Sequence, residues 1–176
     1  MKWISRHNWH SVAFGMVSAL LIVPSNIAES AQIHPYRHSD VDMPVSISVG
    51  AVRTPEFLVT AGWYDIMIQV QDPLPAQQMR CMMGVTTGPL DSKNCSSSDP
   101  LLRADWKVWD GDHVVDRGSI PERCACKFDK DGIFKFLGSF RADAGKRYVV
   151  EVIFTKDGTP LNVADPHLIV IQQGRN

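Results

Sequence analysis

Hydrophobic and polar residues alternate along several short segments of the chain. In residues 63–70, every second position from Tyr64 to Val70 is apolar. A period of two residues is typical of a strand that buries one face. Short apolar or alternating runs predict further strands in residues 45–49, 57–59, 106–109, 113–115, 133–140, 148–154 and 167–171.

Turn-forming residues separate these runs. Asp110-Gly111 stands between two strand segments and predicts a hairpin. Residues 75–83 form the one helix candidate, with proline in the first turn and Gly84 after the last. Residues 88–100 are rich in Ser, Asp, Gly and Pro, which is typical of a surface loop.

This arrangement predicts an all-β fold of about eight or nine short strands with at most one short helix. We expect an immunoglobulin-like or Greek-key β-sandwich. Tyr64 and Tyr148 each begin a strand shortly after a glycine. This pattern resembles the tyrosine corner, in which the phenol bonds to upstream backbone. The alternative is two ordinary tight turns.

The first 30 residues have the pattern of a signal peptide. Lys2 and Arg6 precede an uncharged run over residues 12–23, which Pro24 ends. The run is too short to cross a bilayer comfortably, although an uncleaved anchor is the alternative. Small residues upstream favour cleavage before Ala31. We therefore expect a periplasmic or secreted protein, with an extended leader over residues 31–43 and one domain over residues 44–176.

Charge and hydropathy narrow the range of partners. The chain has 18 Lys and Arg against 19 Asp and Glu, which are interspersed. Nucleic acid is therefore a poor candidate partner, because no basic stripe is present. After signal cleavage no apolar run is long enough to span a membrane, so we expect no membrane association.

Four cysteines follow the export signal: Cys81, Cys95, Cys124 and Cys126. In an oxidising compartment an even number of cysteines predicts disulfides. In an extended segment, Cys124 and Cys126 have Cα atoms about 6.5–7 Å apart, slightly too far for a comfortable bridge. We therefore favour a bridge from each of them to Cys81 or Cys95. One alternative is a bridge between Cys81 and Cys95. Another is that the cysteines bind a metal or take part in redox chemistry.

Motifs for catalysis are missing from the sequence. There is no serine in a glycine-flanked elbow and no helical histidine pair with a glutamate. The thioether groups of Met79, Met82 and Met83 could ligate copper, but methionine more commonly fills irregular space in a protein core. The sequence therefore predicts no enzyme activity, no cofactor and no metal site.

The predicted hairpin carries the candidate partner contacts, which are Trp106, Trp109, Asp110 and His113. Trp106 and Trp109 are an odd number of positions apart, so in a strand they point to opposite faces. One of them is expected in the core. The other could be exposed, and tryptophan is a common anchor in protein interfaces.

The segments Ala61-Gly62-Trp63-Tyr64, Cys81–Gly84, Leu137–Phe140 and Pro166–Val170 also carry a resemblance. They are similar to small secreted bacterial β-sandwich proteins catalogued only as a domain of unknown function, some adjacent to interbacterial toxins. The resemblance covers most of residues 45–172 and implies no catalytic residues. We expect an exported, non-catalytic domain that binds an exported protein partner, such as an immunity or inhibitor protein. The alternative is a carbohydrate-binding β-sandwich module.

Overall fold

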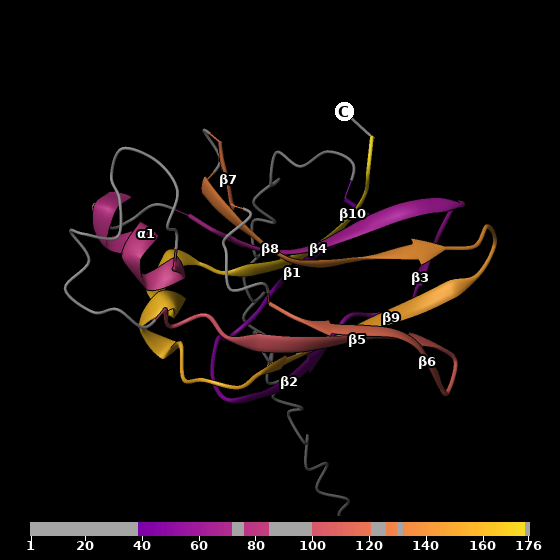
Figure 1. Ribbon diagram of the computed structural model, residues 1–176, viewed down its shortest axis with the longest axis horizontal. Coiled ribbons are helices and arrows are strands. Elements are labelled where there is room, and N and C mark those ends of the chain that lie inside the picture. The colour runs from indigo at the N-terminus through magenta and orange to yellow at the C-terminus, as the bar shows by residue number, and fades with distance from the viewer. Residues whose placement is uncertain (1–38, 72–75, 85–99, 121–125, 130–131, 175–176) are drawn as a thin grey trace, which may run out of the picture. The chain divides into compact units, whose positions relative to one another are not determined.

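The computed structural model describes residues 39–71, 76–84, 100–120, 126–129 and 132–174. These residues form an all-β sandwich of two antiparallel sheets, as the sequence predicts. Figure 1 shows the sheets as two layers, with their strands running across the view.

The first sheet has the order β1-β10-β4-β8-β7. Its strands are β1 (Val41–Pro44), β4 (Gly62–Val70), β7 (Cys126–Asp129), β8 (Gly132–Ala142) and β10 (His167–Gln172). The second sheet has the order β2-β9-β5-β6, and the two-residue strand β3 also pairs with β9. Its strands are β2 (Gly50–Arg53), β3 (Phe57–Leu58), β5 (Ala104–Asp110), β6 (His113–Ser119) and β9 (Arg147–Phe154). Two short helices complete the described residues, α1 (Ala76–Met83) and the 3-10 helix η2 (Thr159–Ala164).

The core lies between the two sheets and follows the predicted alternation. In β4, Tyr64, Ile66 and Ile68 are fully buried, while Trp63 on the other face is 51% exposed. In β5, Val108 is fully buried and packs in the same cluster as Val150 and Val152 of the neighbouring β9. Burial of one face of each sheet is the main source of stability in such a fold.

The predicted hairpin and helix are confirmed. β5 and β6 are joined at Gly111, which has a φ of +60° that glycine adopts without strain. Helix α1 ends before Gly84, whose φ is +72°. Most of the predicted loop over residues 88–100 lies outside the described residues, as does the predicted signal peptide.

The domain begins earlier than the predicted boundary at residue 44. β1 pairs with β10 through Val41, which lies opposite Val170. Val41 is 7% exposed and belongs to the hydrophobic core. Residues 41–43 therefore belong to the first sheet and not to an extended leader, because they pair with β10 and because Val41 and Met43 pack on the core.

The predicted strand over residues 45–49 is wrong. These residues connect β1 to β2, and Val49 is 66% exposed. Ile47 is nevertheless fully buried in the hydrophobic core. Its N–H donates to Asn162 Oδ1 at 2.8 Å, and its carbonyl accepts from the N–H of Gly158 at 3.0 Å. Contacts with the η2 region thus replace strand pairing in this segment.

The two strand-initial tyrosines behave as the tyrosine-corner interpretation requires. Tyr64 Oη accepts from the N–H of Thr60 at 3.1 Å, and Tyr148 Oη accepts from the N–H of Asp143 at 3.4 Å. The ring of Phe140 lies between the two tyrosines, with centroids 5.5 Å from Tyr64 and 5.7 Å from Tyr148. These three rings join β4, β8 and β9 and so connect the two sheets.

Candidate interaction surface

Trp106 is a core residue and not a partner contact. It is 6% exposed, and its Nε1 donates to the carbonyl of Leu137 at 3.0 Å. Its ring lies against Gly118 and Gly138, where an added Cβ would come within 2.6 and 2.4 Å of ring atoms. Trp106 therefore fills the space between the sheets, and its inclusion among the candidate contacts was wrong.

Trp109 lies on the outer face of the second sheet, as the odd spacing from Trp106 predicts. Its Nε1 donates to Glu151 Oε2 at 3.1 Å. The Arg53 guanidinium lies 4.8 Å from the centre of the Trp109 ring, a cation–π arrangement. Arg53 Nε also donates to Glu151 Oε2, at 2.8 Å. The indole is therefore held both at its nitrogen and over one ring face.

Glu151 is the centre of this arrangement. Its side chain is only 8% exposed, although it lies on the outer face of the sheet. Lys107 Nζ lies 4.0 Å from Glu151 Oε1, on the strand next to β9. A carboxylate with this little exposure requires charged partners and hydrogen bonds, and Arg53, Trp109 and Lys107 supply them.

Strand register adds apolar neighbours to Trp109. Val149 of β9 and Val114 of β6 lie directly opposite it on either side. Val114 is 41% exposed and the adjacent Val115 is 50% exposed. The next row on this face is charged and contains Arg53, Glu151, Lys107 and Arg117. We call these two rows the Trp109 face.

Asp110 and His113 lie at the hairpin end of this face but outside the Glu151 arrangement. Asp110 Oδ2 lies 2.9 Å from Lys146 Nζ, which ties the hairpin to the turn between β8 and β9. The hydrogen bond to the Asp110 carboxylate stabilises the charged ammonium of Lys146 and so raises the pKa of Lys146. His113 Nε2 lies 3.2 Å from Asp112 Oδ1, and both side chains are more than 80% exposed.

The open edge of the second sheet at β6 is protected against pairing with another strand. The β5–β6 register shifts between Val108 and Trp109, which marks a bulge. β6 also carries Asp116 and Arg117. Bulges and charges on edge strands discourage strand addition. The Trp109 face is therefore a better candidate for partner binding than the β6 backbone.

Trp63 is an exposed tryptophan that was not among the predicted contacts. It lies on the outer face of the first sheet, opposite Arg141 of β8. Near it in the sheet, Gln173 Nε2 donates to Asp65 Oδ1 at 2.7 Å. The alternation in residues 63–70 already indicated that Trp63 points away from the core.

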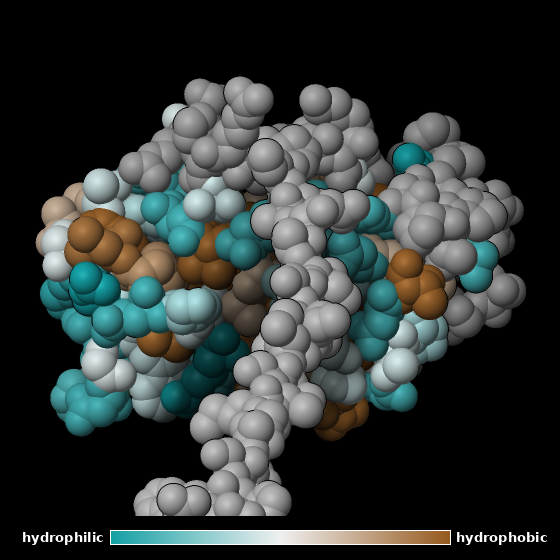
Figure 2. All heavy atoms as spheres, turned by 180° about the vertical axis from the view of Figure 1, so that it is seen from behind, coloured by the Kyte–Doolittle hydropathy of each residue, from teal (hydrophilic) through white to brown (hydrophobic). Residues whose placement is uncertain are grey.

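Other exposed apolar side chains are scattered. Figure 2 shows separate brown patches among teal polar residues on the face behind the view of Figure 1. The exposed large apolar residues in the described ranges are Val49, Leu58, Trp63, Val114, Val115 and Val163. Single exposed apolar residues are common, so the grouping of Val114 and Val115 beside Trp109 is the more informative feature.

Cys81 of α1 and Cys126 of β7 are both disulfide-bonded rather than free thiols. Cys95 and Cys124 lie outside the described residues. The pairing of the four cysteines therefore stays a prediction.

Within the described ranges, no three His, Cys, Asp or Glu side chains are grouped so that they could hold a metal ion. The same residues contain no helix with the length and apolar character needed to cross a bilayer.

Comparison with known proteins adds one relationship, at the level of fold. No protein-family model matches the chain, and no curated protein matches it. The chain is similar to a crystal structure of a protein from Sulfurospirillum deleyianum, with a TM-score of 0.52 and 10% sequence identity. The match covers 77% of this chain and 98% of the other. At this identity the likeness extends to the fold alone.

Proposed function

We propose that the chain is an exported, non-catalytic domain that binds a protein partner through the Trp109 face, as an immunity or inhibitor protein does. The observation that carries the proposal is the fixed position of Trp109, with its Nε1 on Glu151 and Arg53 over its ring. A side chain that is already ordered loses little conformational entropy when a partner covers it.

The composition of this face also supports a protein partner. The apolar residues Val149, Trp109 and Val114 lie beside a row of charged residues. Stable protein interfaces combine an apolar centre with a polar rim, and their energetic anchors are enriched in tryptophan and arginine. Arg53 already occupies one face of the Trp109 ring, so this indole is less suited to stacking against a sugar.

Site-specific photocrosslinking tests the proposal. A photoreactive phenylalanine analogue replaces Val114 on the Trp109 face or, as a control, Val163 in η2, which is 65% exposed. We expect position 114, but not position 163, to yield a discrete protein adduct in the native compartment. Trp109→Ala should weaken the isolated complex by about tenfold or more, as is typical of an interface anchor. Equal labelling from both positions would contradict the proposal.

Export is a separate part of the proposal and rests on residues 1–30 of the sequence. Signal peptidase cleavage should leave a protein that begins at or near Ala31 and carries no lipid. Intact-mass measurement of the protein from the periplasm or culture medium tests this. A mass that includes residues 1–30 would reject cleavage without affecting the binding proposal.

Carbohydrate binding is the second candidate function, and Trp63 is the observation that favours it. This side chain is 51% exposed, and the nearby Asp65 and Gln173 could hydrogen-bond to hydroxyl groups. Saturable binding to a glycan array, abolished by Trp63→Ala and retained by Trp109→Ala, would replace the protein-binding proposal.

A further inference from the structure

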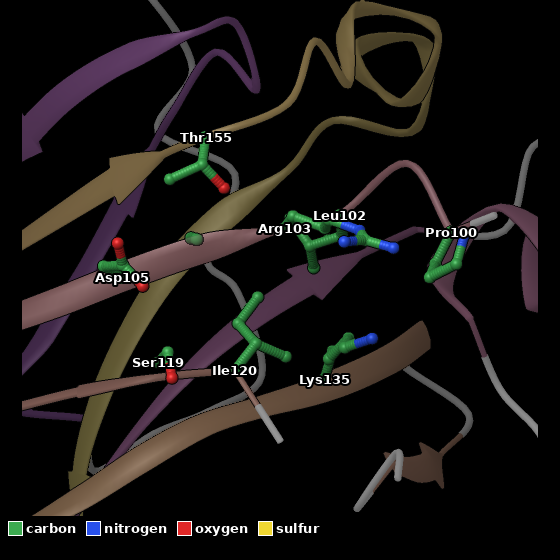
Figure 3. A pocket seen from close by; sticks show the side chains of 9 residues that line it. Pro100, Leu102, Arg103, Asp105, Ser119, Ile120, Lys135 and Thr155 are labelled. Atoms are coloured by element: carbon green, nitrogen blue, oxygen red, sulfur yellow. The ribbon is translucent and has the colours of Figure 1, made fainter. Parts of the chain in front are cut away.

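A pocket of about 370 Å³ lies between the two sheets, away from the Trp109 face (Figure 3). Its walls come from the start of β5, from the ends of β6 and β9, and from β8 of the other sheet. Its lining residues are Pro100, Leu102, Arg103, Ala104, Asp105, Ser119, Ile120, Lys135 and Thr155. Its volume is within the range of small-molecule sites, which is about 300–1,000 Å³.

The backbone around the pocket is fixed by hydrogen bonds. The N–H of Thr155 donates to the carbonyl of Arg103, and the N–H of Ile120 donates to that of Ala104, both at 3.0 Å. Lys156 Nζ donates to the carbonyl of Pro100 at 3.1 Å. These contacts join the start of β5 to the ends of β6 and β9 and so connect the segments that form the pocket walls.

Lys135 is the unusual residue of the pocket. It is only 3% exposed, and its ammonium donates to the carbonyl of Met83 at the end of α1, at 2.7 Å. An ammonium has three donors, so this contact leaves others to face the pocket. Burial and the nearby Arg103 lower the pKa of Lys135 to about 8. A bound anion would offset both effects.

The cationic groups of the pocket lie at one end, and its oxygen-bearing side chains lie at the other. Figure 3 shows the nitrogens of Lys135 and Arg103 toward the Pro100 end, whereas the oxygens of Asp105, Ser119 and Thr155 lie toward the other. Leu102 and Ile120 are apolar residues of the lining. The cationic end suits a carboxylate, and the oxygen-lined end suits an ammonium or hydroxyl donor.

We propose that this pocket binds a small organic carboxylate, held at its anionic end by Lys135 and Arg103 and carrying a hydrogen-bond donor at its other end. Free amino acids and short peptides have this chemistry. The site is independent of the proposed protein-binding function, because it uses none of the residues of the Trp109 face.

Three matched probes test the proposal: alanylalanine, its N-acetyl derivative and its C-terminal amide. The protein, purified in the form in which it accumulates, is titrated with each probe and followed by backbone amide NMR shifts. We expect saturable shifts at Arg103, Asp105 and Ser119 with alanylalanine, with a Kd of about 1 mM or tighter. The amide, which lacks the carboxylate, should bind about tenfold to hundredfold more weakly.

Charge-removing variants identify the binding groups. Lys135→Met and Arg103→Gln should each weaken alanylalanine binding about tenfold or more. Arg103 is exposed, so its variant remains informative if Lys135→Met fails to fold. Arg117→Gln removes an exposed arginine from the Trp109 face and should leave binding unchanged. Absence of saturable binding by all three probes, or equal binding of dipeptide and amide, would overturn the proposal.

Discussion

The hydroxyl of Tyr64 accepts a hydrogen bond from the backbone N–H of Thr60, 3.1 Å away, at the point where the chain enters β4. Tyr64 is completely buried, so this polar group depends on its protein partner. Tyr64→Phe leaves the Thr60 N–H without that acceptor. We expect the free energy of unfolding, measured with urea, to fall by about 1–2 kcal/mol.

Tyr148→Phe is the matched control for this substitution. The corresponding bond from Asp143 to Tyr148 is longer, at 3.4 Å. Since hydrogen bonds weaken with distance, this variant should lose less stability than Tyr64→Phe. A larger loss of stability for Tyr148→Phe would show that hydrogen-bond length does not determine which of the two substitutions is more destabilising.

Gly138→Ala should destabilise the fold by about 1–3 kcal/mol, because a new methyl group would overlap the Trp106 ring. The added Cβ would lie 2.4 Å from ring atoms. Urea unfolding measures the effect, and Gly111→Asn, at a position with nothing within 4 Å, is the near-neutral control. In a Trp106→Phe background the cost of Gly138→Ala should shrink. Strict additivity of the two substitutions would argue against the overlap.

Asp110→Asn should lower the pKa of Lys146, since the hydrogen bond to the Asp110 carboxylate is the main cause of its upward shift. Carbon NMR of selectively methylated lysines reports this pKa directly. Asp143→Asn is the control, because Asp143 lies 3.6 Å from Lys146 and contributes less. A larger change in the Lys146 pKa in Asp143→Asn than in Asp110→Asn would show that Asp110 is not the main cause of the raised pKa.

Lys135 should make the stability of the protein rise between pH 8 and about 10.5. The pKa of its ammonium is about 8 in the folded protein, below the ordinary lysine value of 10.5. In this window the unfolded chain binds the proton more strongly, so stability increases with pH. Relative to Lys135→Met, which lacks the amine, wild type should gain up to about 3 kcal/mol across the window. Parallel pH profiles of the two proteins would contradict the lowered pKa.

Non-reducing peptide mapping should find Cys124 and Cys126 each linked to Cys81 or Cys95. Bridges that close loops of about 30–45 residues stabilise by roughly 3–4 kcal/mol in the chain-entropy model. Reduction should therefore lower the thermal midpoint clearly. A bridge between Cys81 and Cys95 would reject the proposed pairing.

The local sequence pattern was sufficient to predict those strands and turns that its alternation and turn residues define directly. Alternation placed β4, and Asp110-Gly111 placed the β5–β6 hairpin. The same pattern separated Trp106 from Trp109 correctly, but it could not say which of the two was buried. That choice depends on Gly118 and Gly138, which leave room for the Trp106 ring from two other strands.

Contacts between distant segments explain what the sequence did not reveal. Residues 45–49 alternate like a strand, but Asn162 and Gly158 bind the backbone of Ile47 instead. Likewise, Lys135 lies in β8 of the first sheet and Arg103 lies immediately before β5 of the second, and no local spacing links them. Neither the pocket nor the Glu151 arrangement around Trp109 has a short sequence signature, because each is assembled by strand pairing.

The position of β10 has a consequence for the order in which the protein can be made. β10 comes last among the described strands, yet it lies within the first sheet, with Val170 opposite Val41 of β1 and Ile66 of β4. A growing chain that stops before His167 therefore lacks the strand that joins β1 to β4, and it cannot close this sheet. Such long-range pairing is intrinsically slow to form. The topology thus postpones completion of the fold until synthesis reaches β10, which is the property that a chain needs if it is threaded through a membrane pore before folding.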